Sequence, residues 1–79
     1  MNDIKVGDKV KILREFTDDD FKGEYKPSVW MKEMDETIGK IGTVDTIFDW
    51  GEEGSEDYGV TFPDGSNWAY ALAVLEKVE

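Results

Sequence analysis

The 79-residue sequence contains no cysteine and no histidine. Without these residues a chain has no disulfide, no thiolate nucleophile, no zinc site built from Cys and His, and no imidazole to move protons near neutral pH. Ser28, Ser55 and Ser66 therefore lack the His partner that would activate a serine nucleophile. From these absences we expect a protein that is not an enzyme and binds no cofactor.

Long apolar runs are also missing. No segment approaches the roughly 20 apolar residues that span a bilayer, and the N-terminal M-N-D-I-K-V-G-D lacks the apolar region of a secretion signal. We therefore expect a soluble, cytoplasmic protein with no membrane partner. A chain of this length can build only one small core, so we predict a single domain over residues 1–79 and a monomer.

Basic side chains are scarce. The sequence has 9 Lys and Arg against 19 Asp and Glu, for a formal net charge of −10. Residues 1–14 are net positive, and the negative excess lies in residues 15–79. Because non-specific nucleic-acid binding depends on Lys and Arg that displace phosphate counterions, nucleic acid is a disfavoured partner, and a basic peptide or protein fits better.

Alternating apolar and polar residues predict five short strands. This period of two is typical of a strand with one buried face, and it occurs at residues 8–14, 40–48, 58–62, 67–70 and 75–78. Pro63, Asp64 and Gly65 predict a tight turn between the third and fourth strands. A-L-A-V at 71–74 predicts a helical turn before the last strand. Since all connections but the first are too short for crossover helices, the fold class is all-β, as a small closed or partly closed barrel.

The first connection, residues 15–37, is long and acidic. Its aromatic residues argue against disorder, since disordered segments are poor in them. Ser28 is a candidate N-cap, and Trp30 and Met34 at i and i+4 would share a helix face, so we predict a short helical turn near 28–35.

Two glycines, Gly39 and Gly42, stand at the start of the second strand. The spacing and the lone Lys40 do not match the phosphate-binding G-x-x-x-x-G-K-[ST] motif. The imperfect alternation that follows predicts a β-bulge or strong bend, for which glycine supplies the backbone freedom. We therefore predict a structural role for Gly39, Gly42 and, in the tight turn, Gly65.

The inward positions of these strands and of their flanks predict the core. It comprises Val6, Val10, Ile12, Ile38, Val44, Ile47, Val60, Phe62, Trp68, Leu75 and Val78.

Several motifs together resemble SH3-like barrels. V-G-D-K-V-K-I followed by I-G-K-I-G-T-V-D-T-I resembles the KOW pattern. The longer order of V-G-D-x-V-x-I, M-D-x-x-I-G-K-x-G-T-V, F-x-D-G-x-x-W-x-Y and L-E-x-V is similar to the SH3-like repeats of Mind bomb, of related plant ubiquitin ligases, and of small phage proteins. The resemblance covers essentially the whole chain and implies a five-stranded SH3-like barrel with a long first loop. It also implies the host cytoplasm as the location if the chain is phage-encoded.

In the SH3-like plan the first loop, the second loop and the helical turn meet at one end of the barrel. Exposed Trp and Tyr often carry interface energy, and acidic side chains around them would attract Arg or Lys. We therefore predict a non-catalytic module that binds a basic peptide or a basic protein patch. The predicted binding residues are Tyr25, Trp30, Asp35, Glu36, Trp50, Glu52, Glu53 and Tyr70.

Two other functions remain as alternatives. A phage-type acidic inhibitor or DNA mimic would suit the net charge, and would need carboxylates along an extended face rather than exposed tryptophan. KOW-like nucleic-acid binding would need basic residues around the glycines, where Lys40 stands among Asp35, Glu36 and Asp45. No metal site is predicted, because an EF-hand aligned at Asp49 lacks ligands at its third and twelfth positions.

Overall fold

The alternating segments of the sequence form strands close to their predicted bounds. The computed structural model describes residues 4–21, 29–48 and 56–78. Its strands are β1 (Lys9–Ile12), β2 (Ile41–Phe48), β3 (Asp57–Thr61), β4 (Asn67–Ala71) and β5 (Leu75–Val78). The all-β fold class and the five predicted strands are thus confirmed.

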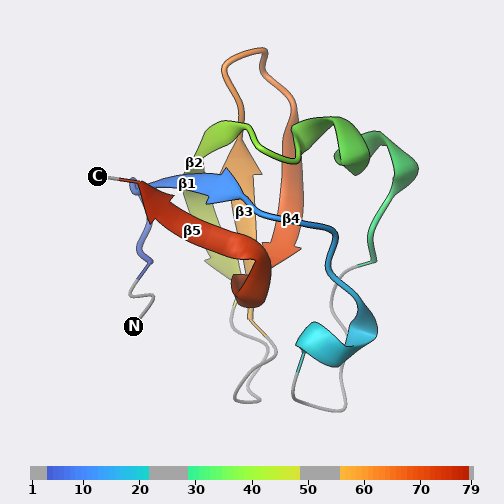
Figure 1. The fold of residues 1–79 in the computed structure, drawn as a ribbon. Coiled ribbons are helices and arrows are strands. Elements are labelled where there is room, and N and C mark those ends of the chain that lie inside the picture. Colours follow the sequence, from blue (N-terminus) through green and yellow to red (C-terminus); the bar gives the residue numbers. More distant parts are fainter. Residues whose placement is uncertain (1–3, 22–28, 49–55, 79) are drawn as a thin grey trace.

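The five strands form one antiparallel sheet in the order β4-β3-β2-β1-β5. Strands β2, β3 and β4 follow one another as neighbours, whereas β1 pairs with both β2 and β5. In Figure 1, β1 and β5 run across the front of β2 and β3. Among the described residues the hydrogen-bonded order ends at β4 and β5, so the sheet is open and not the closed barrel that the sequence analysis allowed.

Strand β2 contains the predicted bulge. Its pairing with β3 shifts register between Val44, which lies opposite Val60, and Thr46, which lies opposite Gly59. The extra residue, Asp45, accepts a hydrogen bond from the Thr61 hydroxyl. The bulge explains the imperfect alternation in this strand, because inward positions change parity beyond it.

In the described parts of the chain, three short 3-10 helices lie between the strands. They are η1 (Asp18–Asp20), η2 (Lys32–Thr37) and η3 (Leu72–Val74). Helix η3 confirms the helical turn predicted before the last strand. Helix η2 overlaps the turn predicted near 28–35 but begins later, and the proposed cap Ser28 lies outside the described residues.

Two of the predicted structural glycines lie in turns, and the third lies within strand β2. Gly39 and Gly65 have φ of +86° and +92°, a region that side-chain-bearing residues rarely adopt. A Cβ atom on Gly42 would lie 2.5 Å from Cγ1 of Val60 and 2.9 Å from the carbonyl oxygen of Thr61. Gly42 therefore allows β2 to approach β3 closely.

Six of the predicted core residues are confirmed as buried. Val10, Ile12, Val44, Val60, Phe62 and Leu75 are buried, while Ile47, Trp68 and Val78 are partly buried.

Two of the predicted core residues are exposed. Val6 is 60% exposed because a turn, in which the Asp8 N–H donates to the Lys5 carbonyl, precedes β1. Ile38 is 42% exposed because it follows η2 at the turn that ends in Gly39. The prediction that these two belong to the core was wrong, since both lie in turns next to β1 and β2 and not within a strand.

The connection between β1 and β2 contributes much of the core that was not predicted. Phe16 and Phe21 flank η1, Met34 lies in η2, and all three are buried. The other buried apolar residues missed by the sequence analysis are Ile4, Tyr58, Tyr70, Ala71 and Val74. The β1–β2 connection is therefore packed onto the sheet as a structural part of the domain.

Candidate functional site

The predicted binding residues fall into two groups. Tyr25, Trp50, Glu52 and Glu53 lie outside the described residues. Trp30, Asp35, Glu36 and Tyr70 are described, and they gather around η2 and the part of β4 that faces it. The site is therefore built here from η2, its flanks and β4.

Tyr70 is a core residue and not the exposed binding residue that was predicted. It is fully buried, and its ring makes edge-to-face contacts with Phe16 and Phe62 at centroid distances of 6.4 and 6.3 Å. Burial raises the pKa of the Tyr70 phenol, and the hydrogen bond with Thr37 only partly opposes this. Tyr70 thus acts as a neutral, packed anchor for η2.

The Thr37 hydroxyl links η2 to the sheet. Its oxygen lies 2.7 Å from the Met34 carbonyl oxygen, to which it donates, and 2.7 Å from the Tyr70 hydroxyl. Because a threonine hydroxyl has one hydrogen, Tyr70 must be the donor to Thr37. This chain from β4 into the helix backbone fixes which side of η2 faces the core.

Helix η2 has three distinct faces. In a 3-10 helix side chains three residues apart eclipse each other, so K-E-M-D-E-T splits into the pairs Lys32/Asp35, Glu33/Glu36 and Met34/Thr37. Met34 and Thr37 are buried, and the other two pairs are exposed. One exposed face therefore carries opposite charges, and the other carries two like charges.

Trp30 connects the core to the Lys32/Asp35 face. Its ring packs edge-to-face on Phe16 at 5.4 Å and on Tyr70 at 5.9 Å, leaving the side chain partly buried. Its indole N–H donates to Oδ1 of Asp35 at 2.6 Å. Trp30 and Asp35, both predicted site residues, are thus in direct contact.

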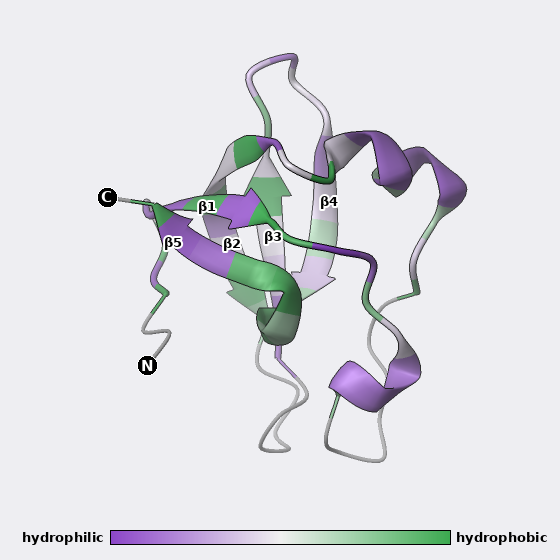
Figure 2. Cartoon of the chain, in the orientation of Figure 1, coloured by the Kyte–Doolittle hydropathy of each residue, from purple (hydrophilic) through white to green (hydrophobic). Residues whose placement is uncertain are grey.

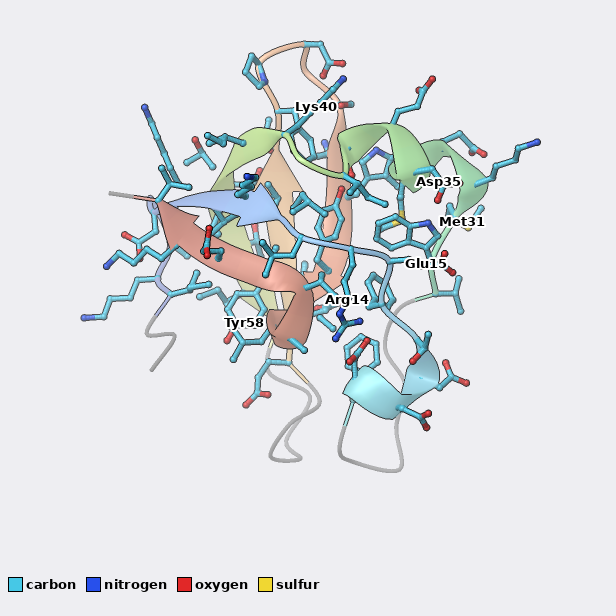
Figure 3. All side chains as sticks on the ribbon, in the orientation of Figure 1. Arg14, Glu15, Met31, Asp35, Lys40 and Tyr58 are labelled. Carbon is cyan, nitrogen blue, oxygen red and sulfur yellow. The ribbon has the colours of Figure 1, made fainter. Side chains whose placement is uncertain are left out.

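Exposed apolar side chains flank Trp30. Val29 is 67% exposed and Met31 is 44% exposed. Figure 3 shows Met31 and Asp35 beside each other on η2 and its flank, with Glu15 and Arg14 further along the same side of the molecule. We call Val29, Trp30 and Met31 the apolar strip; it adjoins a hollow of about 320 Å³ lined by Lys32, Glu33, Asp35 and Glu36.

Helix η1 is the second acidic element of the connection. Its Asp20 accepts hydrogen bonds from Arg14, at 2.9 and 3.0 Å, and from the Thr17 backbone N–H at 2.9 Å. The Arg14 hydrogen bonds are the main reason that the pKa of Asp20 is lowered. Asp18 and Asp19 remain exposed. Figure 2 shows η1 and η2 as hydrophilic segments on the same side of the domain.

Residues 4–21, 29–48 and 56–78 contain no group of three or more His, Cys, Asp or Glu placed to hold a metal ion. Within the same ranges no helix has the length and apolarity needed to cross a bilayer.

Comparisons with protein-family models, with curated proteins and with solved structures found no match to this chain.

Proposed function

We propose that this protein is a non-catalytic binding module whose β1–β2 connection recognises a basic peptide or a basic patch on a protein partner. The observation that carries the proposal is the apolar strip beside the acidic residues of η2. Val29 and Met31 are exposed although they are apolar. Asp35 lies close to them because it accepts a hydrogen bond from Trp30, the residue between them in the sequence. Exposed apolar groups rimmed by charge are typical of interaction surfaces.

The chemistry of a Lys or Arg side chain fits this surface. Its aliphatic stem would lie along the apolar strip while its charged end meets a carboxylate of η2. The acidic charge of η1 would add longer-range attraction and raise the rate of encounter. Asp18 and Asp19 are exposed and available for that role.

We also propose an SH3-like barrel as the fold of this module. The pairing of β1 with both β2 and β5, and the short helix η3 between β4 and β5, support it. The proposal places the long connection before β2 in the position of the first SH3-like loop.

The function is tested by calorimetric titration with a short peptide of Arg, Lys and Leu, and with a matched peptide carrying Glu in place of the basic residues. We expect the basic peptide alone to bind, more weakly as salt increases. Absence of binding at low salt would overturn the proposal.

Paired variants locate the surface. Met31→Ser should weaken binding by about tenfold, or 1.4 kcal/mol. Ile41→Ser should not, although Ile41 on β2 has the same exposed fraction of 44%. Asp35→Asn keeps an acceptor for Trp30 and removes one charge; Glu76→Gln on β5 is its charge-matched control. If both charge variants weaken binding equally and Met31→Ser has no effect, the acidic-mimic alternative is favoured.

A further inference from the structure

A small pocket lies on the other exposed face of η2, between that helix and the turn that joins β3 to β4. Its volume is about 140 Å³, and its lining includes Glu33, Glu36, Lys40, Phe62, Asp64 and Trp68. A cavity of about 150 Å³ in another protein holds a benzene molecule, so this pocket can take one side-chain head group but no longer segment.

The far wall of the pocket is the β3–β4 turn, which is closed by hydrogen bonds. Across the β3–β4 turn, the Phe62 N–H donates to the Ser66 carbonyl at 2.8 Å, and the Gly65 N–H donates to the Phe62 carbonyl at 2.9 Å. Asp64 accepts from the Ser66 N–H at 2.9 Å and from its hydroxyl at 2.6 Å. These bonds fix the carboxylate in place, and they are the main reason that the pKa of Asp64 is lowered.

The near wall carries uncompensated charge. Glu33 and Glu36 are the like-charged pair of η2, which the three-residue period places one above the other. Together with Asp64 they give the pocket three carboxylates against the single ammonium group of Lys40. The excess of carboxylates around one pocket attracts a cation.

An aromatic surface completes the pocket. Trp68 is partly buried on β4, an edge strand of the sheet, and Phe62, which also lines the pocket, is held by its ring contact with Tyr70. A planar cation stacks on an indole and also donates several hydrogen bonds in its own plane, which an ammonium group does not do.

We propose that this pocket binds the guanidinium group of an arginine side chain, stacked on Trp68 and bonded to the carboxylates of Glu33, Glu36 and Asp64. The inference rests on the proposed function, in which it supplies the anchor for one arginine of the partner. The pocket is lined by the Glu33/Glu36 face of η2, whereas the apolar strip adjoins the Lys32/Asp35 face.

The pocket is tested by NMR titration of the protein with N-acetylarginine amide and, separately, N-acetyllysine amide. The indole N–H signal of Trp68, assigned with Trp68→Phe, and the amide of Ser66 report on binding. We expect saturable shifts of both signals with the arginine amide, and much smaller shifts with the lysine amide. Equal responses would overturn the choice of guanidinium, and no saturable shift would overturn the site.

Charge variants test the proposed guanidinium site, because some should weaken arginine-amide binding and one should strengthen it. Glu36→Gln and Asp64→Asn, which keeps an acceptor for Ser66, should each weaken arginine-amide binding about fivefold, the effect of losing one partly exposed ion pair. Lys40→Met should strengthen it, because the competing cation is removed. Glu76→Gln and Lys11→Gln, opposite each other on β5 and β1, are the matched controls and should have no effect.

The same variants separate this inference from the proposed function. If the basic peptide binds with sensitivity to Met31→Ser but not to Glu36→Gln or Asp64→Asn, the pocket inference fails and the proposed function stands. If the arginine amide shifts Trp68 while the basic peptide does not bind, the proposed function fails and the pocket inference stands.

Discussion

The sheet and the β1–β2 connection bury apolar side chains equally well but are held in place differently. The five strands are joined by ladders of backbone hydrogen bonds. The described part of the connection is held mainly by side chains: the rings of Phe16 and Trp30, the hydroxyl of Thr37, and the Arg14–Asp20 pair. Figure 1 shows the connection as two short helices beside the strands.

This difference shows that a connection can be part of the core without a regular backbone pattern. In the sheet a single side-chain change leaves the ladder intact. In the connection the side chain is itself the attachment, so its loss should also release the neighbouring backbone. Local opening should accordingly be easiest in the connection.

The largest effect is expected from Phe16→Ala. This variant tests whether the connection contributes to the core as much as the sheet does. Phe16 is buried against Phe21, Trp30 and Tyr70, so its truncation should destabilise the protein by about 3–5 kcal/mol, similar to Leu75→Ala in β5. Urea unfolding measures both variants, and Phe16→Leu replaces the first if it does not fold. A cost below about 1 kcal/mol would show that the connection is peripheral.

Gly39 and Gly42 lie where the connection meets β2. Substituting either by alanine should destabilise the protein, but for different reasons. Gly42→Ala places a methyl group against Val60 and the Thr61 backbone and should cost about 1–3 kcal/mol by overpacking. Gly39→Ala meets no atom within 4 Å but strains a backbone with φ of +86°, which should cost about 1–2 kcal/mol. Adding Val60→Ala to each variant distinguishes them, because it should offset part of the cost at Gly42 and none at Gly39.

A smaller effect is expected from Tyr70→Phe. This variant removes the hydrogen bond between Tyr70 in the sheet and Thr37 in η2 and changes nothing else in the side chain. The ring packing remains, so the cost should be about 1 kcal/mol. Hydrogen exchange should become faster at the amides of η2 and stay unchanged in β2 and β3. A uniform increase in both regions would contradict the view that the connection opens separately from the sheet.

The smallest effect is expected from Arg14→Gln, which removes an ion pair at the edge of the connection. The Arg14 side chain is 53% exposed, so the cost at pH 7 should be less than about 1 kcal/mol. Since the pKa of Asp20 is lowered in the folded protein, the pair stabilises it above the ordinary aspartate pKa of about 3.9, and this contribution is lost as pH falls through the lowered value. The difference in unfolding free energy between wild type and variant should therefore shrink between pH 7 and pH 3.

The sheet could be predicted because each strand carries a repeating pattern. Val10 and Ile12 alternate with lysines in β1, and the bounds of β5 were predicted to the residue. The core prediction was wrong just outside the strands: Val6 and Ile38 were predicted to be buried, but both lie in turns and are exposed. The same reasoning predicted a closed or partly closed barrel, whereas the described sheet is open. Closure depends on pairing between the two edge strands, which the pattern within one strand does not indicate.

The connection could be predicted only in part because its packing has no single period. Phe16 and Phe21 carry no alternation that would mark them as buried. Tyr70 was predicted as a binding residue from the SH3-like plan, and its hydrogen-bond partner Thr37 is too distant in sequence for a local pattern to indicate that the two meet in the core. One signal was available in K-E-M-D-E-T, whose three-residue period separates Met34 and Thr37 from the charged residues. Read in this way, the sequence also places Glu36 with Glu33 and apart from Asp35.

The pairing of β1 with β5 has a consequence for how the protein folds. Strands β2, β3 and β4 are consecutive neighbours, so they can form by closing short loops. The partners of β1 on its other edge are Leu75 to Val78, almost the whole chain away, and a contact so distant in sequence forms slowly. We expect the three-stranded meander to form early and the β1–β5 ladder to be a late step, so β1, although it precedes the other four strands, would be among the last to gain all its partners.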